Sequence, residues 1–175
     1  MSFDIYDASV PVFVDLLSNM RAWLDKAAAE KPEAELISAR LAPDMRPLSA
    51  QYQMASDSAK NAVARLCGID PPVMADIETS FAALRDRCDQ TIAFITSVDR
   101  SAFAASDSRA VEIRFPGGTG YGFDGARYLT AFALPNFMFH ATTAYAILRA
   151  AGVSLGKPDF LRHLGPPNLG PDGSA

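Results

Sequence analysis

His140 is the side chain of this sequence best suited to chemistry. A histidine can act as a general base, a hydrogen-bond partner or a metal ligand near neutral pH. His140 interrupts a run, residues 137–148, that is apolar almost all round a helix. We therefore expect this helix to be the most buried one, with the ring pointing into the protein or toward its edge. A structural histidine, bonded to a carboxylate, amide or carbonyl, is the alternative interpretation.

The histidine and cysteine counts exclude the common zinc sites. The chain of 175 residues has two histidines and two cysteines, too few for a three-histidine or a four-thiolate site. Cys67 and Cys88 are predicted on neighbouring antiparallel helices, offset by roughly 20 Å along the axis. Because a disulfide needs Cα atoms within about 7 Å, we expect two reduced, buried thiols.

Four further residues are candidates for binding a ligand beside His140. Asn136 and Tyr145 lie on the same predicted helix, and Gln53 and Asp57 lie one turn apart on an earlier helix. A helical wheel places Asp57 opposite the apolar stripe of that earlier helix. The stripe is mostly alanine, so an inward-facing Asp57 stays open as an alternative.

The glycine-rich segment 117–122 resembles a phosphate-binding loop but lacks the Gly-Lys-Ser/Thr ending of one. It follows an alternating apolar and polar stretch, residues 111–115, so a hairpin turn is the favoured interpretation. The sequence contains neither a nucleophile-elbow serine nor a His-Glu-x-x-His motif.

Long stretches of helical periodicity must position these residues. Apolar residues step by four and three from Tyr6 to Ala27, and similar patterns cover residues 47–66, 74–97 and 136–151. Near Pro11 the first helix either kinks or begins with Ser9 as its cap. Asp124 is predicted to cap a helix over 125–132, which Pro135 and Asn136 then break or redirect.

These elements predict an all-α protein, an up-and-down four-helix bundle with a small β-hairpin insertion at 110–123 before the last long helix. We expect one domain over residues 1–164 and a flexible tail, rich in proline and glycine, over 165–175. The net charge of −4 argues against nucleic-acid binding. The absence of a long apolar run and of a signal-peptide pattern predicts a cytoplasmic protein that does not bind membranes.

The last long helix also carries a family resemblance. The strings 134–149 and 152–160, the opening Ile5 to Pro11 and the stretch Asp57 to Lys60 are similar to an uncharacterised bacterial family of unknown function. That family is placed with the DinB-like (DinB/YfiT-like) helical bundles. The resemblance covers the chain to about Leu164 and implies a four-helix bundle and a homodimer.

DinB-like relatives commonly bind a divalent metal through one histidine of the second helix and two histidines, four residues apart, on the fourth. Some of them transfer low-molecular-weight thiols. His140 matches the first histidine of the pair, but Ala144 stands at the second position and the second helix has no histidine. With Asp57 or Gln53 as replacements, the site would be rich in oxygen, weak for zinc and marginal for manganese or nickel.

We therefore predict a DinB-like bundle without the three-histidine site and without a metal cofactor. A weakly bound divalent metal is the alternative. Its expected function is the binding of a small molecule near His140. A metal-assisted or histidine-based enzyme acting on a thiol or another small substrate is the alternative, and a module that dimerises through its helix faces is a third.

Overall fold

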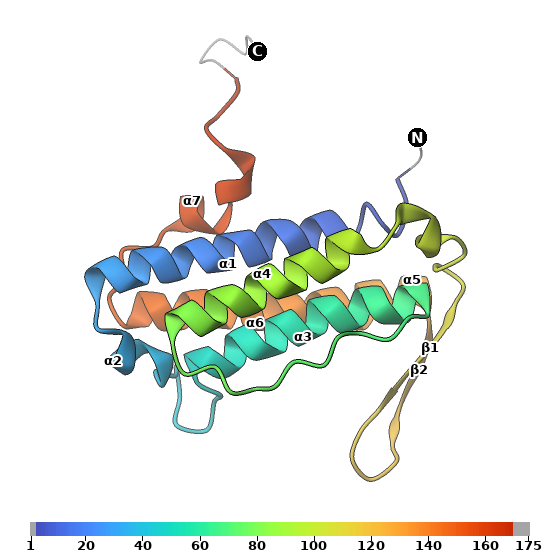
Figure 1. Cartoon of the computed structure of the whole chain (residues 1–175), viewed down its shortest axis with the longest axis horizontal. Helices are drawn as coiled ribbons and strands as arrows, with labels where there is room; N and C mark the ends of the chain where they lie inside the picture. Colours follow the sequence, from blue (N-terminus) through green and yellow to red (C-terminus); the bar gives the residue numbers. More distant parts are fainter. Residues whose placement is uncertain (1–2, 170–175) are drawn as a thin grey trace.

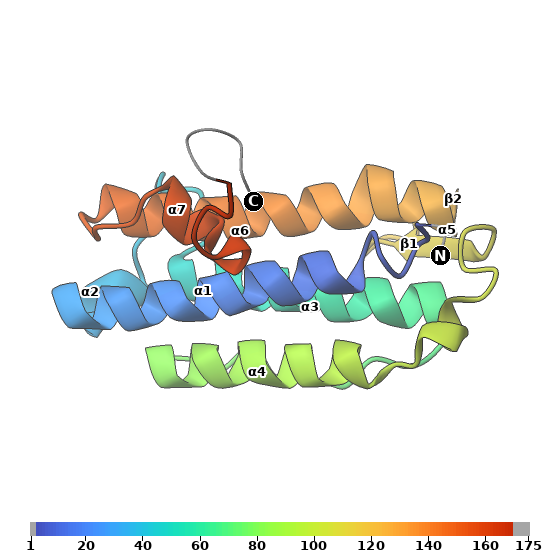
Figure 2. The ribbon, with the colours of Figure 1, turned by 90° about the horizontal axis from the view of Figure 1, so that it is seen from above.

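Four long helices lie side by side in the structure, a computed structural model that describes residues 3–169 (Figures 1 and 2). They are α1 (Val10–Glu30), α3 (Leu48–Cys67), α4 (Phe81–Ser97) and α6 (Leu134–Ala150). The shorter elements are α2 (Glu33–Ile37), η1 (Arg100–Phe103), β1 (Ala110–Arg114), β2 (Gly120–Asp124), α5 (Gly125–Tyr128), η2 (Leu129–Ala133), α7 (Lys157–Phe160) and η3 (Arg162–Leu164). The predicted helical bundle with a hairpin before its last long helix is confirmed.

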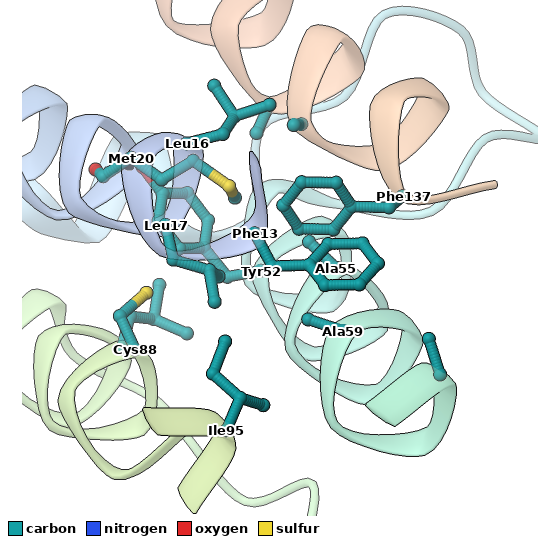
Figure 3. Packing of buried hydrophobic residues seen from close by; sticks show 14 of the residues in the cluster. Phe13, Leu16, Leu17, Met20, Tyr52, Ala55, Ala59, Cys88, Ile95 and Phe137 are labelled. Atoms are coloured by element: carbon teal, nitrogen blue, oxygen red, sulfur yellow. Dashed lines mark hydrogen bonds between the residues drawn. The ribbon is translucent and has the colours of Figure 1, made fainter. Parts of the chain in front are cut away.

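The hydrophobic core lies between the four long helices (Figure 3). The predicted stripe of α1 is buried from Val10 to Ala27, and Phe13 meets Phe137 of α6 edge to face with ring centroids 4.9 Å apart. Ser9 directly precedes α1 and Pro11 lies in its first turn, but the predicted cap is wrong, because the Ser9 hydroxyl donates to the Ile5 carbonyl at 2.6 Å and accepts from no amide of the helix. None of the helices within residues 3–169 has the length and apolar character that a membrane span requires.

Helices α3 and α4 run in the same direction (Figure 1), so the bundle does not have the predicted up-and-down order, and Cys67 and Cys88 do not lie on antiparallel helices. Both helices end beside the hairpin, where η1 directly follows α4 and contacts α3. Residues 69–79 return along the outside of the bundle and contact both helices (Figure 1). An extended chain covers about 3.3 Å per residue, so this segment can span the roughly 30 Å length of α3. Both cysteines are buried free thiols.

Because of the returning segment, the third long helix also begins later in the chain than predicted. The sequence predicted this helix from Met74, but α4 begins at Phe81, and the Ser80 side chain accepts a hydrogen bond from the amide of Ala83 at 3.1 Å. Ile77, which fits the apolar period predicted over residues 74–97, is exposed. Serine is a strong N-cap because its hydroxyl accepts from an amide that has no partner within the helix.

The hairpin leads into one long helical stretch. β1 and β2 pair antiparallel, and Asp124 caps α5 by accepting from the amide of Arg127, as predicted. The expected break at Pro135 is wrong, because α5, the π-helical η2 and α6 continue without interruption from Gly125 to Ala150. Pro135, which has no N–H to donate, stands where the π-helical η2 joins α6, so the local change in helix type accompanies the proline.

Helix α6 is not buried all round. Met138 and Phe139 are exposed on its outer face, while Phe137, Ala141 and Leu148 are buried. Residues 165–169 of the predicted tail are exposed and belong to no helix or strand, and residues 170–175 lie outside the described part of the chain.

Candidate functional site

His140 is buried where α6 faces α3, and one of its ring nitrogens is bonded to the fold. Its Nδ1 lies 2.9 Å from Oε1 of Gln51 on α3. The amide nitrogen of Gln51 in turn donates to the carbonyl oxygen of Arg46 at 3.0 Å. Because this second bond identifies the nitrogen end of the amide, Oε1 is the atom that faces the histidine.

The orientation of Gln51 determines which nitrogen of His140 carries the proton. An amide oxygen only accepts, so Nδ1 must donate its proton to it. Burial lowers the pKa of His140 from its usual value, which keeps the ring neutral at neutral pH. In this neutral tautomer Nε2 carries a free lone pair, and no residue in the range 3–169 hydrogen-bonds to it.

A cavity of about 340 Å³ lies beside His140. Its walls come from α3, from the stretch α5–η2–α6 and from strand β1, so the hairpin covers part of it. The lining residues are Met54, Asp57, Ser58, Asn61, Arg65, Ile113, Tyr128, Phe132, Ala133, Asn136 and His140. The π-helical segment η2 contributes Phe132 and Ala133, and such segments are frequent at functional sites.

Three polar side chains of α3, spaced seven residues apart, each contact the helix opposite. Gln51 bonds to His140, Ser58 accepts from the Asn136 amide at 2.7 Å, and Arg65 donates to the Tyr128 hydroxyl at 3.2 Å. Seven residues are about two turns, so all three lie on one face of α3. A row of polar contacts therefore joins α3 to α5 and α6 along the cavity.

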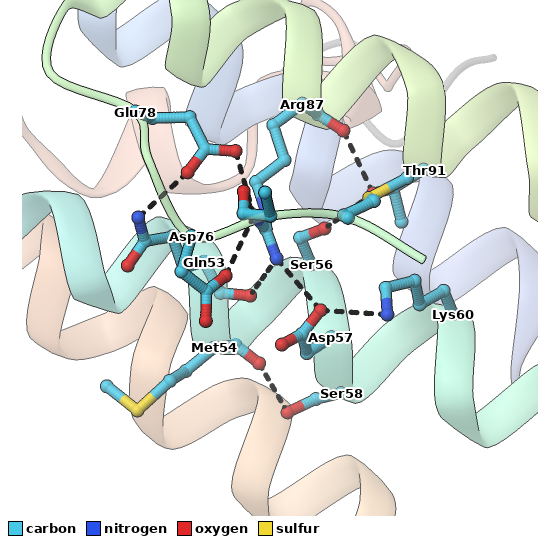
Figure 4. Close-up of polar contacts among 12 residues, drawn as sticks. Gln53, Met54, Ser56, Asp57, Ser58, Lys60, Asp76, Glu78, Arg87 and Thr91 are labelled. Carbon is cyan, nitrogen blue, oxygen red and sulfur yellow. Dashed lines mark hydrogen bonds and ion pairs between the residues drawn. The ribbon is translucent and has the colours of Figure 1, made fainter. Parts of the chain in front are cut away.

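Two of the predicted ligand-binding residues join His140 at this cavity. Asn136 lines it and is held by Ser58. Asp57 also lines it, but its Oδ1 is 2.8 Å from Arg87 of α4 and 3.0 Å from Lys60 (Figure 4). The charge of Asp57 is therefore already paired with cations of the protein.

The other two predicted residues lie elsewhere. The Gln53 amide donates to Glu78 of the returning segment at 2.8 Å, in the same polar cluster as Arg87 (Figure 4). The Tyr145 ring packs edge to face on Trp23 and Phe160, with centroids 5.6 Å from each. Neither residue is among those that line the cavity.

Reasoning from the sequence did not identify Gln51, Ser58, Arg65 and Tyr128 as site residues. The available signal was the seven-residue spacing of the polar positions 51, 58 and 65, of which Gln51 is buried, Ser58 half-buried and Arg65 exposed. Tyr128 had no such signal, because its partner Arg65 is 63 positions earlier in the chain.

The residues at His140 do not fit the three-nitrogen metal site of DinB-like relatives. Nδ1 is engaged by Gln51, Ala144 has no donor atom, and the carboxylate of Asp57 is held by two cations. Within residues 3–169 no three histidine, cysteine, aspartate or glutamate side chains gather where they could hold a metal ion. This donor set supports no step that runs through a metal.

The comparisons with known proteins agree with this architecture. The family described as "Domain of unknown function (DUF1993)" matches residues 5–161. A solved structure of a DinB family member protein from Shewanella denitrificans is 36% identical, with a TM-score of 0.82, and the match covers 95% of this chain and 94% of that one. No curated protein matches the chain significantly. The chain thus belongs to the DUF1993 family, a domain of unknown function with the bundle of a DinB family protein.

Proposed function

We propose that this protein binds a small molecule in the cavity between α3 and α6, and that the molecule donates a hydrogen bond to Nε2 of His140. The observation that carries the proposal is the chain of two hydrogen bonds from Arg46 through Gln51 to Nδ1. It holds the ring in the tautomer whose acceptor atom has no partner among the described residues. A cavity that combines apolar walls with a few oriented polar groups is typical of ligand sites.

A matched pair of probes tests the proposal. 4-Ethylphenol can donate to Nε2, whereas 4-ethylanisole has nearly the same shape and no donor. We expect the phenol to bind about 2- to 10-fold more tightly by calorimetry, the range of one net hydrogen bond. The preference should vanish in His140→Phe, and Asn61→Trp, which fills the cavity, should weaken both probes.

Equal affinities of the two probes for the wild-type protein would contradict the role of His140. If neither probe shifted the backbone amide signals of Ile113, Phe132 or Asn136 in NMR spectra, the cavity would not be a binding site for this class of molecule. Thermal unfolding of the variants checks that they fold.

A histidine-based enzyme acting on a thiol or another small substrate is the second candidate. The free lone pair of Nε2 favours it, because a general base needs such an atom. Gln51 is uncharged, however, so it orients the ring without making Nε2 more basic as a carboxylate would. The only lining serine, Ser58, donates its hydroxyl proton to the Met54 carbonyl at 2.6 Å.

Turnover experiments separate the two candidates. Loss of free thiol from a mixture of a small thiol and an electrophile, abolished by His140→Gln, would favour the enzyme. Elemental analysis of protein purified without a histidine tag addresses the metal-assisted version. Stoichiometric metal that is lost in His140→Ala would favour that version over the binding protein.

A further inference from the structure

The end of the cavity away from His140 carries a positive charge. Among the described residues, Arg65 is the only cation that lines the cavity. No carboxylate among residues 3–169 lies within 4.0 Å of its guanidinium group. One of its nitrogens, Nη1, donates to the Tyr128 hydroxyl, and its carbon Cζ lies 6.0 Å from the centre of that ring. The guanidinium has five donors, so most of them are left for a ligand.

Tyr128 adds a second donor at the same place. Its side chain is buried, and its hydroxyl oxygen accepts from Arg65, which leaves the hydroxyl proton free to be donated. No acceptor for that proton is recorded in the described part of the chain. Burial raises the pKa of Tyr128 above its usual value, so the hydroxyl stays protonated at neutral pH.

The opposite end of the cavity accepts hydrogen bonds. His140 presents the lone pair of Nε2, and Asp57 also lines the cavity, with Oδ1 bound to Arg87 and Lys60. Along α3 the lining runs from Met54 to Arg65, a rise of about 16 Å at 1.5 Å per residue. Ile113, Phe132 and Ala133 supply apolar wall. The cavity is thus elongated, with donors at one end and acceptors at the other.

We propose that the ligand is a small organic acid whose carboxylate binds Arg65 and Tyr128. Its apolar body lies along Phe132 and Ile113, and a hydroxyl or amine at its other end donates to His140. This inference rests on the proposed function, since it names the class of molecule that the same cavity takes. A carboxylate suits the site because its two oxygens match the paired donors of a guanidinium group.

A four-probe experiment tests the acid separately from the binding function. The probes are 3-(4-hydroxyphenyl)propanoate, its uncharged analogue 3-(4-hydroxyphenyl)propanamide, 4-ethylphenol and 3-phenylpropanoate. We expect the hydroxy acid to bind most tightly by calorimetry, about 10- to 100-fold more tightly than the amide, which is the range for a hydrogen-bonded charge. The phenyl acid should lose the 2- to 10-fold preference that His140 provides, about one neutral hydrogen bond.

Variants assign the effect to the two donors. Arg65→Gln should remove the preference for the acid over the amide, and Tyr128→Phe should reduce it. Arg127→Gln, a matched arginine on the adjacent exposed surface outside the cavity lining, should leave it unchanged. His140→Gln should weaken the hydroxy acid but keep its advantage over the amide.

The outcomes separate the two proposals. Equal binding of acid and amide, or an acid preference that survives in Arg65→Gln, would overturn the organic acid while leaving the cavity a binding site. Binding of the acids that depends on Arg65 but not on His140 would support the carboxylate site at Arg65 and Tyr128 and contradict the role of His140 in both proposals. Failure of all four probes to bind would overturn both.

Discussion

The two ring nitrogens of His140 have different surroundings, so spectroscopy of the ring should distinguish them. In the wild-type protein, nitrogen-15 spectra of the imidazole should show a protonated Nδ1 and an unprotonated Nε2, because Gln51 offers only an oxygen to the ring. In Gln51→Leu this constraint is absent, so we expect a mixture of tautomers. A wild-type ring protonated at Nε2 would contradict the assignment.

The lowered pKa of His140 predicts a pH dependence of stability. The unfolded chain takes up a proton on this ring near the usual value of 6.5, but the folded chain does so only at lower pH because burial opposes the imidazolium. The contribution of this group to the free energy of unfolding is therefore constant above about pH 6.5 and decreases as the pH falls below it. Charged groups near the cavity are Asp57, which Arg87 and Lys60 hold, and Arg65.

Urea unfolding at about pH 7.5 and about pH 5.5 checks this expectation. The loss of stability between the two values should be smaller in His140→Gln than in the wild-type protein. His163→Gln is the matched control, since His163 is exposed and accepts a hydrogen bond from Asn19. An equal loss in the wild-type protein and in His140→Gln would show that burial does not perturb this ring.

At the scale of secondary structure, Arg87 joins the returning segment to both α3 and α4. Its buried guanidinium lies 2.8 Å from Glu78, 3.0 Å from Asp76 and 2.8 Å from Asp57 (Figure 4). Burial opposes its charge, but these carboxylates outweigh that effect and raise the pKa of Arg87. One side chain thus connects the three parts of the chain that meet where α3 and α4 run in parallel.

Removing this arginine should destabilise the bundle strongly. Arg87→Met leaves Glu78, which is only 11% exposed, without its main cation, and we expect a loss of about 2–4 kcal/mol in the free energy of unfolding. The control is Arg114→Met, which breaks the exposed pair with Glu112 on β1 and should change stability little. Similar losses in the two variants by chemical denaturation would contradict the structural role of Arg87.

The same elements show what could be predicted from the sequence. The periodic stripe from Val10 to Ala27 and the alternation before the glycine-rich turn each reflect one buried face, so α1 and the hairpin were predictable. The start of α4 was not, because Ile77 fits a helical period although its segment is extended and held by Glu78. The periodicity of apolar residues indicates which face of a helix is buried, but it does not indicate the direction in which the next helix runs.

For the candidate site too, features of a single helix were predictable from the sequence, whereas contacts between helices were not. His140 could be placed on an inward face from its own helix, whereas the pairing of Arg65 with Tyr128 depends on how α3 and α5 meet in the folded protein. Asp57 could not be assigned from a wheel because an alanine-rich stripe leaves the inward face poorly defined. Its partner Arg87 lies 30 positions later in the chain, and it contacts Asp57 because the returning segment makes α3 and α4 parallel.

For the whole molecule, the family resemblance predicts a homodimer, and the outer face of α6 is where we expect its contact. Met138 is 37% and Phe139 56% exposed, and α6 has no charged residue before Arg149. If this face forms the dimer, Phe139→Glu should reduce the mass measured by light scattering at micromolar concentration to that of a monomer. Ile77→Glu also replaces an exposed apolar side chain with a charged one, but on the returning segment, and it should leave the measured mass unchanged. A monomeric wild-type protein would contradict the expectation.

The order of the helices along the chain also determines when the cavity can form during synthesis. Helices α1, α3 and α4 leave the ribosome first, and they can bury faces against one another before α6 is made, because α4 packs against both α1 and α3. The second wall of the cavity arrives only with residues 125–150. Until then the α3 face with Gln51, Ser58 and Arg65 is in contact with water. Exposure to water costs less free energy for these polar side chains than it would for an apolar stripe. The nascent chain is thus spared an aggregation-prone surface at the place where the finished protein has its cavity.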